Sequence, residues 1–377
     1  MSEEVKYGLA GVLADDTRIS KVMPEINSLT YRGYKVQDLA STCVFDETAY
    51  LIWNGELPTK DQLISFKAAE RKERGLSGDL IDVMRKFNAQ AHPMDTLRTA
   101  VSFLGQSDDT TNDSSPEGLY AKAQRMYAKI PQIVATDFRL RNGKDPIEPR
   151  DDLDFCENFF HMSFGEVPAP AVVKCFDVSM TLYAEHSFNA STFTARTIAS
   201  STSDIYSSVT GAIGSLKGPL HGGANEAVMD LLLEVGSPDN AREWMLTALK
   251  EKRKIMGFGH RVYRSGDSRV PTMTDAYKKM VDVIGSEEAK KFWEISSILD
   301  KTMVDEKQIY PNLDFPAGPA YYLMGFEIPM FTPIFVVSRI TGWTAHVMEQ
   351  LADNKLIRPL SRYTGPQQRD VVAIEKR

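Results

Sequence analysis

The sequence predicts an all-α protein. Apolar residues recur at helical spacing in several long segments, whereas the period-two alternation of a strand is convincing only around residues 28–35. The helical segments are 116–130, 168–186, 192–216, 224–235, 286–305 and 332–354. A chain with this pattern buries its apolar surface mainly by packing helices against one another.

Helix-boundary residues recur along the whole chain and support the same class. They are a capping box at Thr59 and Gln62, glycines suited to helix ends at Gly55, Gly75 and Gly143, and prolines suited to first turns at Pro116 and Pro131. The polar stretch 105–115 predicts a surface loop between helices.

Length and composition predict two domains. With 377 residues the chain is longer than one hydrophobic core usually serves, so we expect a large domain, a smaller one and a cleft between them. Hydrophobic residues make up 42% and charged residues 25%, which is typical of a folded globular protein.

Charge and cysteine usage exclude several functional classes. The net charge is −7 and basic residues do not gather in one run, so nothing indicates nucleic-acid binding. Cys43, Cys156 and Cys175 are far apart among apolar residues, which predicts reduced thiols and a cytoplasmic protein. We expect no leader and no membrane span, and the motifs of nucleotide hydrolysis, dinucleotide binding and zinc peptidases are missing.

His221 is the first candidate catalytic residue. It lies between Gly218 and the pair Gly222-Gly223, after one predicted helix and before another. The glycines leave room for a ligand to approach the imidazole, and the free N–H groups at the start of the next helix favour developing negative charge. The alternative is a histidine that only caps a turn.

His260 and the arginines that follow it predict an anion site. Arg264 and Arg269 follow within ten residues, and guanidinium groups beside an imidazole suit carboxylates or phosphates. A solvated basic loop is the alternative. Arg339 lies in an apolar run, where an unpaired charge would cost several kcal/mol on burial. Its partner is therefore either a bound anion or a structural Asp or Glu.

Asp314 is the candidate base. Phe315 and Pro316 follow it, and partial desolvation beside them would raise the basicity of the carboxylate. Taken alone, Asp314 fits a helix N-cap better. His186 lies between two predicted helical segments and can face a cleft. The remaining histidines, including His92, His161 and His346, are interpreted as structural, and no spacing among the six indicates a metal site.

Together these residues resemble the citrate synthases, and within them the short bacterial and archaeal form that includes 2-methylcitrate synthases. The resemblance covers nearly the whole chain. It rests on Leu29 to Tyr34, His92 to Asp95, Glu185 to Thr192, the segments of His221 and His260, Pro311 to Asp314, and Ile357 to Pro359.

The resemblance implies an almost entirely helical fold that closes over its substrates, in a homodimer. A large domain would comprise residues 1–221 and 330–377, and a small, mobile, CoA-binding domain would comprise residues 222–329. The N-terminal β-rich domain of the larger, NADH-inhibited enzymes has no counterpart, so we expect a dimer without NADH control.

The resemblance also implies roles for individual residues. Asp314 would remove a proton from the α-carbon of an acyl-CoA, His221 would hydrogen-bond the thioester oxygen, and His260 would polarise the ketone of oxaloacetate. Oxaloacetate would be held by His186, Arg269 and Arg339, with Arg358 contributed by the other subunit.

The implied CoA contacts are Lys254, Ile255, Met256, Gly257, Phe258 and Gly259 around the adenine, and Arg264 at the phosphates. Acyl-CoA would be a co-substrate, with no tightly bound cofactor and no metal. The C-terminal tail resembles that of methylcitrate synthases, so the prediction is a 2-methylcitrate synthase that also makes citrate. The alternatives are a strict citrate synthase of the tricarboxylic acid cycle, a lyase that runs the related condensation backwards on a CoA ester, and an inactive helical dimer that only senses acyl-CoA or oxaloacetate.

Overall fold

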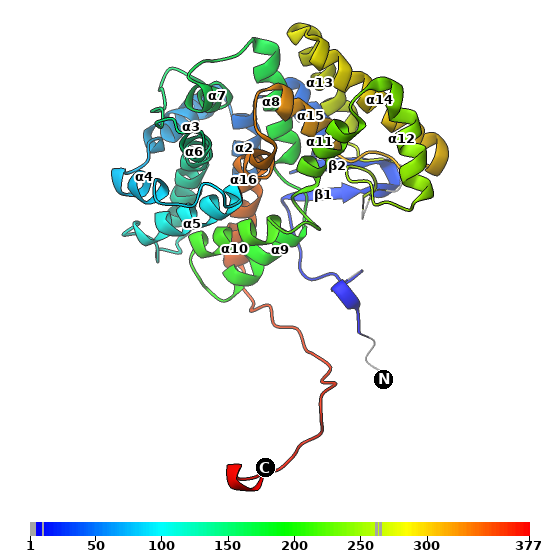
Figure 1. Ribbon diagram of the computed structural model, residues 1–377. Coiled ribbons are helices and arrows are strands. Elements are labelled where there is room, and N and C mark those ends of the chain that lie inside the picture. The colour runs from blue at the N-terminus through cyan, green and yellow to red at the C-terminus, as the bar shows by residue number, and fades with distance from the viewer. Residues whose placement is uncertain (1–4, 10, 261–262, 264–265) are drawn as a thin grey trace.

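The computed structural model describes residues 5–9, 11–260, 263 and 266–377, and within them it is mostly helical (Figure 1). The helices are α1 Val36–Thr42, α2 Phe45–Asn54, α3 Lys60–Glu73, α4 Gly78–Met84, α5 Pro93–Gln106, α6 Pro116–Arg141, α7 Phe155–Phe164, α8 Pro170–Tyr183, α9 Ala190–Ser200, α10 Ile205–Leu216, α11 Ala224–Val235, α12 Pro238–Lys250, α13 Val270–Ile284, α14 Glu287–Lys307, α15 Asp314–Leu323 and α16 Phe331–Ala352. The all-α prediction is confirmed. None of the helices described is long and apolar enough to span a bilayer.

One small antiparallel sheet precedes the helices. Its strands are β1 Ser20–Met23, β2 Ser28–Tyr31 and β3 Tyr34–Lys35, in the order β1-β2-β3. The predicted alternation at 28–35 is the β2–β3 hairpin, in which Tyr31 pairs with Tyr34 across a turn at Arg32 and Gly33. Both turn residues have positive φ, at 50° and 92°. β1 was not predicted, because its four residues are too few to show a clear alternation of apolar and polar side chains.

The core is organised around α16, which lies at the centre of the helical body and packs on α2, α6, α8 and α9 (Figure 1). Every residue of α16 from Phe331 to Val347 is buried. A helix that is apolar on all sides needs neighbours on all sides, so α16 fixes the positions of the helices around it. Arg339 and His346 are exceptions to its apolar character, and both are fully buried.

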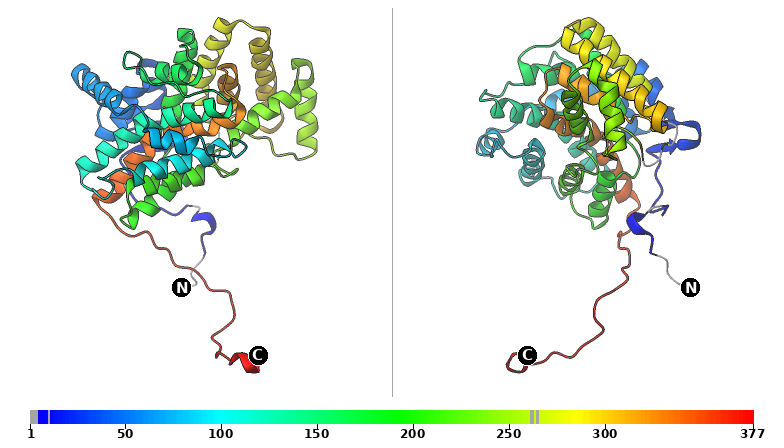
Figure 2. Two further views of the ribbon diagram at one scale, coloured as in Figure 1. Left: turned by 60° about the vertical axis from the view of Figure 1, so that its left-hand side comes forward. Right: turned by 45° about the vertical axis from the view of Figure 1, so that its right-hand side comes forward.

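The segment from α11 to α15 forms the side of the molecule at the upper right of Figure 1. Within it α11 packs on α15, and α14 packs on α12 and α13. α13 also packs on α8, so this group is joined to the rest of the body. The first described residues and the chain after α16 run away from the body on the same side (Figure 2).

Several predicted boundaries are confirmed. Thr59 and Gln62 exchange both hydrogen bonds of a capping box at the start of α3. Pro116 is the first residue of α6, and Gly55 ends α2 with a φ of 90°. Residues 107–115 join α5 to α6, as expected for the polar stretch.

Two boundary predictions were wrong. Pro131 does not begin a helix but lies inside α6, where burial of the surrounding helix outweighs the one hydrogen bond that proline removes. The predicted helix 192–216 is two helices, because Asp204 caps a new N-terminus by accepting the backbone N–H of Ser207 at 2.8 Å. Cys43, Cys156 and Cys175 are buried and free, as predicted.

Candidate active site

The end of α8, the start of α9 and the loop between them, residues 182–191, form the structural centre of the candidate site and are together called the α8–α9 connection. Its backbone carbonyls accept hydrogen bonds from two buried arginines: Leu182 O from Arg269 Nη1 at 3.4 Å, and Tyr183 O from Arg339 Nε at 2.7 Å. The same short segment carries His186 and, as described next, contacts Asp314 and His221. Residues that are far apart in the sequence therefore meet at one turn between two helices.

Asp314 is the first residue of α15, and its side chain points to α8. The Tyr183 hydroxyl donates to Asp314 Oδ1 at 2.7 Å, and the backbone N–H of Asp314 is held by Asn312 Oδ1 at 3.1 Å. Burial raises the pKa of Asp314 to about 6, while the bond from Tyr183 acts in the opposite direction. The helix N-cap is Leu313 without a side-chain bond, so the interpretation of Asp314 as an N-cap was wrong.

His221 lies in the loop between α10 and α11, as predicted. Its Nε2 accepts the backbone N–H of Ser191 at 3.1 Å and is 2.8 Å from the Ser191 hydroxyl, which Trp343 Nε1 also contacts at 3.1 Å. Burial, with Arg339 nearby, lowers the pKa of His221 to about 4. The imidazole is therefore neutral at pH 7, and an Nε2 that accepts an N–H leaves the ring proton on Nδ1.

The glycine beside His221 has a packing role as well as the predicted one. A Cβ at Gly222 would overlap the carbonyl oxygen of Leu216 at the end of α10. At Gly223 a Cβ would meet nothing within 4 Å. The close return of the loop to α10 therefore requires glycine at the first of these positions only, and it fixes the direction from which the imidazole enters the site.

His260 and His186 lie side by side, with ring centroids 5.1 Å apart. His260 Nδ1 accepts the backbone N–H of Tyr263 at 3.2 Å, which leaves the proton of a neutral ring on Nε2. Burial, with Arg269 nearby, lowers the pKa of His260 to about 4 and holds that of His186 well below its usual range. His186 Nε2 is buried without a hydrogen-bond partner among the described residues, which suits a group that a ligand would complete.

The two arginines differ in how they are paired. Arg269 forms a bidentate ion pair with Asp267, with Nε and Nη2 at 2.9 and 2.7 Å from the two carboxylate oxygens. Arg339 is 2% exposed, lies over the Phe335 ring at 4.6 Å, and has no carboxylate within ion-pair distance in the described part of the chain. The buried Glu185 carboxylate still raises the pKa of Arg339 from beyond ion-pair distance, so a structural carboxylate and a bound anion both stay open as its partner.

Electrostatic influence also connects the candidate groups. Arg269 and Arg339 both lower the pKa values of Asp314 and His186, Arg339 lowers that of His221, and Arg269 lowers that of His260. Coulombic effects of this kind need charges within a few ångströms of the titrating group. Asp314 and the three histidines therefore each lie within electrostatic range of Arg269, Arg339 or both.

The predicted CoA segment 254–259 is attached to the strand-like segment before Asp314. Gly259 N donates to Tyr310 O at 2.8 Å, Asn312 N donates to Gly257 O at 2.9 Å, and Asn312 Nδ2 donates to Gly259 O at 3.0 Å. Gly257 and Gly259 both have positive φ, at 82° and 79°. This pairing joins the loop that carries His260 to the turn that carries Asp314.

The remaining members of the segment are Lys254, Ile255, Met256 and Phe258, and the Phe258 ring packs at a tilt of 53° against that of Phe315, with centroids 4.5 Å apart. Arg264 lies outside the described residues. Arg358 is exposed on the C-terminal segment after α16, one residue beyond Ile357, whose N–H donates to Ser200 Oγ at 3.0 Å. The chain that follows runs away from the body (Figure 1).

Two of the histidines interpreted as structural, His92 and His346, have protein partners that account for their positions. His92 accepts Met94 N at 3.2 Å as the N-cap of α5, and its Nε2 is 3.3 Å from Glu226. His346 contacts Glu185 and Arg196 inside the core. No group of three or more potential metal ligands occurs within the described ranges.

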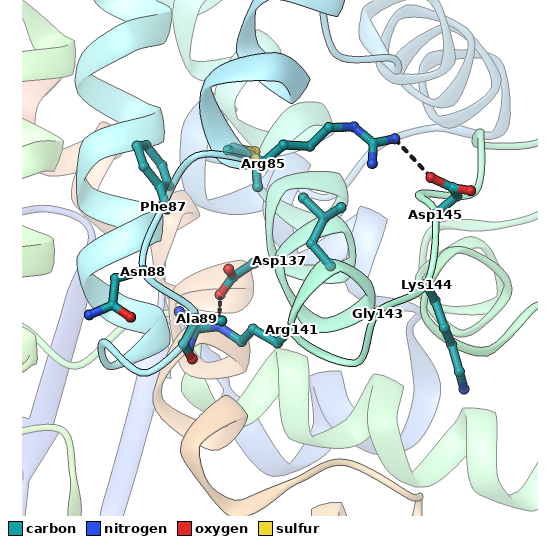
Figure 3. Close-up of a pocket in the computed structure, with 11 residues that line it drawn as sticks. Arg85, Phe87, Asn88, Ala89, Asp137, Arg141, Gly143, Lys144 and Asp145 are labelled. Atoms are coloured by element: carbon teal, nitrogen blue, oxygen red, sulfur yellow. Dashed lines mark hydrogen bonds and ion pairs between the residues drawn. The ribbon is translucent and has the colours of Figure 1, made fainter.

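A surface hollow between α4 and the end of α6 lies apart from this site (Figure 3). Arg85 pairs with Asp145 at 2.9 Å and Arg141 pairs with Asp137 at 2.7 Å in its wall. Four charged groups of this hollow therefore neutralise one another. Among the residues that line it, none has a buried polar atom without a hydrogen-bond partner, unlike His186 in the candidate site.

Comparison with known proteins decides the family. A sequence profile described as "Citrate synthase, C-terminal domain" matches residues 8–360. The chain belongs to the citrate synthase family. Over 368 residues it is 56% identical to a citrate synthase of Mycolicibacterium smegmatis, covering 98% of this chain and 97% of the other. Over 366 residues it is also 56% identical to a 2-methylcitrate synthase of Mycobacterium tuberculosis, covering 97% and 92%.

Solved structures agree. A citrate synthase crystal structure from Pyrobaculum aerophilum superposes with a TM-score of 0.93 at 37% identity, covering 98% of this chain and 95% of the other. A citrate synthase from Thermoplasma acidophilum, in a ternary complex with carboxymethyl coenzyme A and oxaloacetate, gives a TM-score of 0.93 at 29% identity, covering 99% and 100%. The activity of the family is condensation of an acyl-CoA with oxaloacetate, so the chain is an acyl-transferring enzyme.

Four residues of the site were not predicted: Tyr183, Ser191, Asp267 and Trp343. Tyr183 and Ser191 flank His186 and were within reach of the sequence argument, since both lie at the junction of two predicted helices. Asp267 precedes Arg269 by two residues, a spacing that allows an ion pair but does not distinguish it from a solvated charge.

Proposed function

We propose that this enzyme condenses propionyl-CoA, and also acetyl-CoA, with oxaloacetate and water to give 2-methylcitrate and citrate, and that it does so as a cytoplasmic homodimer. The observation that carries the mechanism is the protonation of the three central groups. A carboxylate of raised basicity lies in the same site as two neutral imidazoles, whose ring protons lie on Nδ1 of His221 and Nε2 of His260 because the other ring nitrogen accepts a backbone N–H. The proposed reaction uses acyl-CoA as a co-substrate and needs no metal.

Asp314 is the base of the proposed first step. Tyr183 engages Oδ1, so Oδ2 is the oxygen that would take a proton from the α-carbon of the thioester. With a pKa near 6 the carboxylate is still ionised at pH 7 and is more basic than an ordinary aspartate. An enol forms only if the thioester oxygen receives a hydrogen bond while the proton leaves, and His221 Nδ1–H supplies that donor.

His260 serves the second substrate. Its Nε2–H would donate to the ketone oxygen of oxaloacetate and polarise the carbonyl for attack by the enol carbon. The pKa of about 4 keeps this imidazole neutral, so it stabilises the developing oxyanion as a hydrogen-bond donor. His186, Arg269 and Arg339 would hold the ketoacid by its carboxylates.

A two-domain arrangement fits the proposed order of events. The large domain would be residues 1–221 and 330–377, and the small domain residues 222–329, with CoA held by residues 254–259 and by Arg264. Asp314 and His260 then belong to the small domain, and the α8–α9 connection belongs to the large one. Closure of the small domain over the substrates would complete the site and exclude water until condensation is finished.

Arg358 is proposed to act in the partner subunit. It is exposed, and the chain beyond it leaves its own body, which supports delivery to another molecule. Mixing Arg358→Ala chains with Asp314→Asn chains tests this under conditions that exchange subunits. Recovery of activity toward a quarter to a half of wild type is expected, and absence of recovery in verified mixed dimers would contradict a shared site.

The acyl preference is tested by thiol release from acetyl-CoA and from propionyl-CoA, each with oxaloacetate. The two substrates differ by one methylene, which a pocket discriminates by about 1 to 3 kcal/mol, or roughly 10- to 200-fold in kcat/KM. We expect both to react, with propionyl-CoA at least as good as acetyl-CoA. A kcat/KM for propionyl-CoA well below that for acetyl-CoA would favour the second candidate, a strict citrate synthase, and a relative of that name is as similar to the chain as the methylcitrate synthase is.

A further inference from the structure

Asp267 is the most fully engaged carboxylate near the site, although it faces no proposed substrate atom. Oδ1 accepts the backbone N–H of Arg269 at 3.1 Å and Arg269 Nε at 2.9 Å. Oδ2 accepts Arg269 Nη2 at 2.7 Å and the backbone N–H of Leu313 at 3.2 Å. The Asp267 side chain is 0% exposed, and its neighbour Arg269 holds its pKa well below the usual range despite burial.

These contacts connect the starts of two helices. Arg269 immediately precedes α13, and Leu313 immediately precedes α15, whose first residue is Asp314. In neither helix does the N-cap residue itself make a side-chain cap, and at α15 Asn312 Oδ1 accepts the N–H of Asp314. A buried carboxylate between two helix N-termini receives their backbone N–H groups and is favoured by both helix dipoles. One side chain therefore holds two backbone segments that are more than forty residues apart in the sequence.

The same contacts orient the Arg269 side chain. The ion pair uses the Nε and Nη2 edge of the guanidinium, and Nη1 reaches Leu182 O in the α8–α9 connection at 3.4 Å. A guanidinium group is planar, so holding its Nε and Nη2 edge also fixes the direction in which Nη1 points. The turn itself is anchored from α1, because Gln37 Nε2 donates to Ser268 O at 2.9 Å.

We infer that Asp267 is a positioning residue that links the arginine recognising oxaloacetate to the turn that places the catalytic base. This inference rests on the proposed roles of Arg269 and Asp314. It goes beyond them, because it predicts that one buried carboxylate affects both substrate affinity and turnover through separate contacts. The competing interpretation is that Asp267 only neutralises Arg269 and is displaced by the substrate carboxylate.

The first test is Asp267→Asn, with oxaloacetate binding measured by titration calorimetry and turnover measured by thiol release. The amide has the same size, but it cannot accept all four N–H groups and carries no charge. Loss of charge-assisted bonds of this kind is expected to weaken oxaloacetate binding by about tenfold or more and to lower kcat by about tenfold or more. Asp300→Asn is the matched control, since it removes a half-buried carboxylate of α14 outside the site; both values should stay within about twofold of wild type.

A double-mutant cycle with Arg269→Gln separates the two contacts. If Asp267 acts on affinity through Arg269, Asp267→Asn adds less than about threefold to the loss of oxaloacetate affinity once Arg269→Gln is present. It should still lower kcat in that background, because the link to Leu313 N–H does not involve the arginine. A purely structural role would give losses that add fully in both readouts.

The results with the Asp267 variants distinguish a positioning role from displacement by substrate. Tighter or unchanged oxaloacetate binding by Asp267→Asn would overturn the inference and support displacement by substrate. Should that variant fail to fold in circular dichroism, Asp267→Glu keeps the charge and displaces the carboxylate by one methylene. It is expected to fold and to lose affinity and kcat together, and wild-type behaviour of Asp267→Glu would refute the inference. A wild-type enzyme that binds oxaloacetate but releases no thiol would instead contradict the proposed function.

Discussion

Replacing Tyr183 by phenylalanine should move the acidic limb of the pH profile upward. The Tyr183 hydroxyl donates to Asp314 Oδ1 at 2.7 Å, and it is the largest of the effects that lower the pKa of a carboxylate that burial raises to about 6. Without the hydroxyl the ionised base loses a donor, while the surrounding apolar burial stays. The pKa must therefore rise, and the base is protonated over a wider range of pH.

The size of the shift follows from the strength of the bond. A hydrogen bond to a charged group contributes about 1.5 to 3 kcal/mol, and one pKa unit corresponds to about 1.4 kcal/mol. The expected rise is roughly one to two units, to a pKa of about 7 to 8. At pH 7 the ionised fraction of Asp314 would fall from about nine-tenths to between about a half and a tenth. The kcat/KM at pH 7 should drop about two- to tenfold, and that at pH 9 should change little.

The assay is kcat/KM for the acyl-CoA by thiol release, measured from pH 5 to pH 9 at saturating oxaloacetate. Tyr321→Phe is the matched control, because Tyr321 is equally buried on α15 but its hydroxyl donates to Ser179 Oγ at 3.0 Å. Its acidic limb should coincide with that of wild type. A Tyr183→Phe profile with an unmoved or lowered acidic limb would refute the assignment of Asp314 as the titrating base.

Three further predictions concern other parts of the molecule. Arg339→Gln should raise the KM for oxaloacetate by about 10²-fold, and the melting temperature should also fall because the buried bond to Tyr183 O is lost; an unchanged KM in a folded variant would contradict this. Gly222→Ala should lower the melting temperature and kcat, because its Cβ would overlap the Leu216 carbonyl, whereas Gly223→Ala should leave both near wild type; equal effects would refute the packing argument. Burial raises the pKa of Asp46 to about 7, so the folded state keeps a proton that the unfolded state releases, and stability falls as the pH rises from about 4 to about 7. Asp46→Asn should therefore raise the free energy of unfolding more at pH 8 than at pH 5, and the difference between the two gains should be about 1 to 3 kcal/mol in urea titrations. A gain that is the same at both pH values would contradict this pH dependence.

Much of the fold was predictable because its signals are local. Capping at Thr59, the glycine end of α2 and the apolar spacing of α11 each depend on residues within one or two turns. Pro131 shows where local reasoning fails. A proline is usually read as a boundary, but α6 is held on both sides of it by tertiary burial that its own sequence does not display.

The candidate site was predictable in its residue types but not in its contacts. Histidines between glycines and an arginine in an apolar run are unusual enough to be noticed in the sequence. Which group Asp314 contacts is a different matter, because Tyr183 is 131 residues away and only the packing of α8 against α15 brings them together. The same holds for the link from Asp267 to Leu313, which spans 46 residues.

The most direct test of the central claim is Asp314→Asn, examined for oxaloacetate binding and turnover together. The substitution keeps the size of the side chain and the neighbouring histidines but removes the proton acceptor. We predict that calorimetric oxaloacetate affinity stays within about threefold of wild type while kcat falls by at least about 10³-fold. Turnover within tenfold of wild type, with binding intact, would show that another group removes the α-proton.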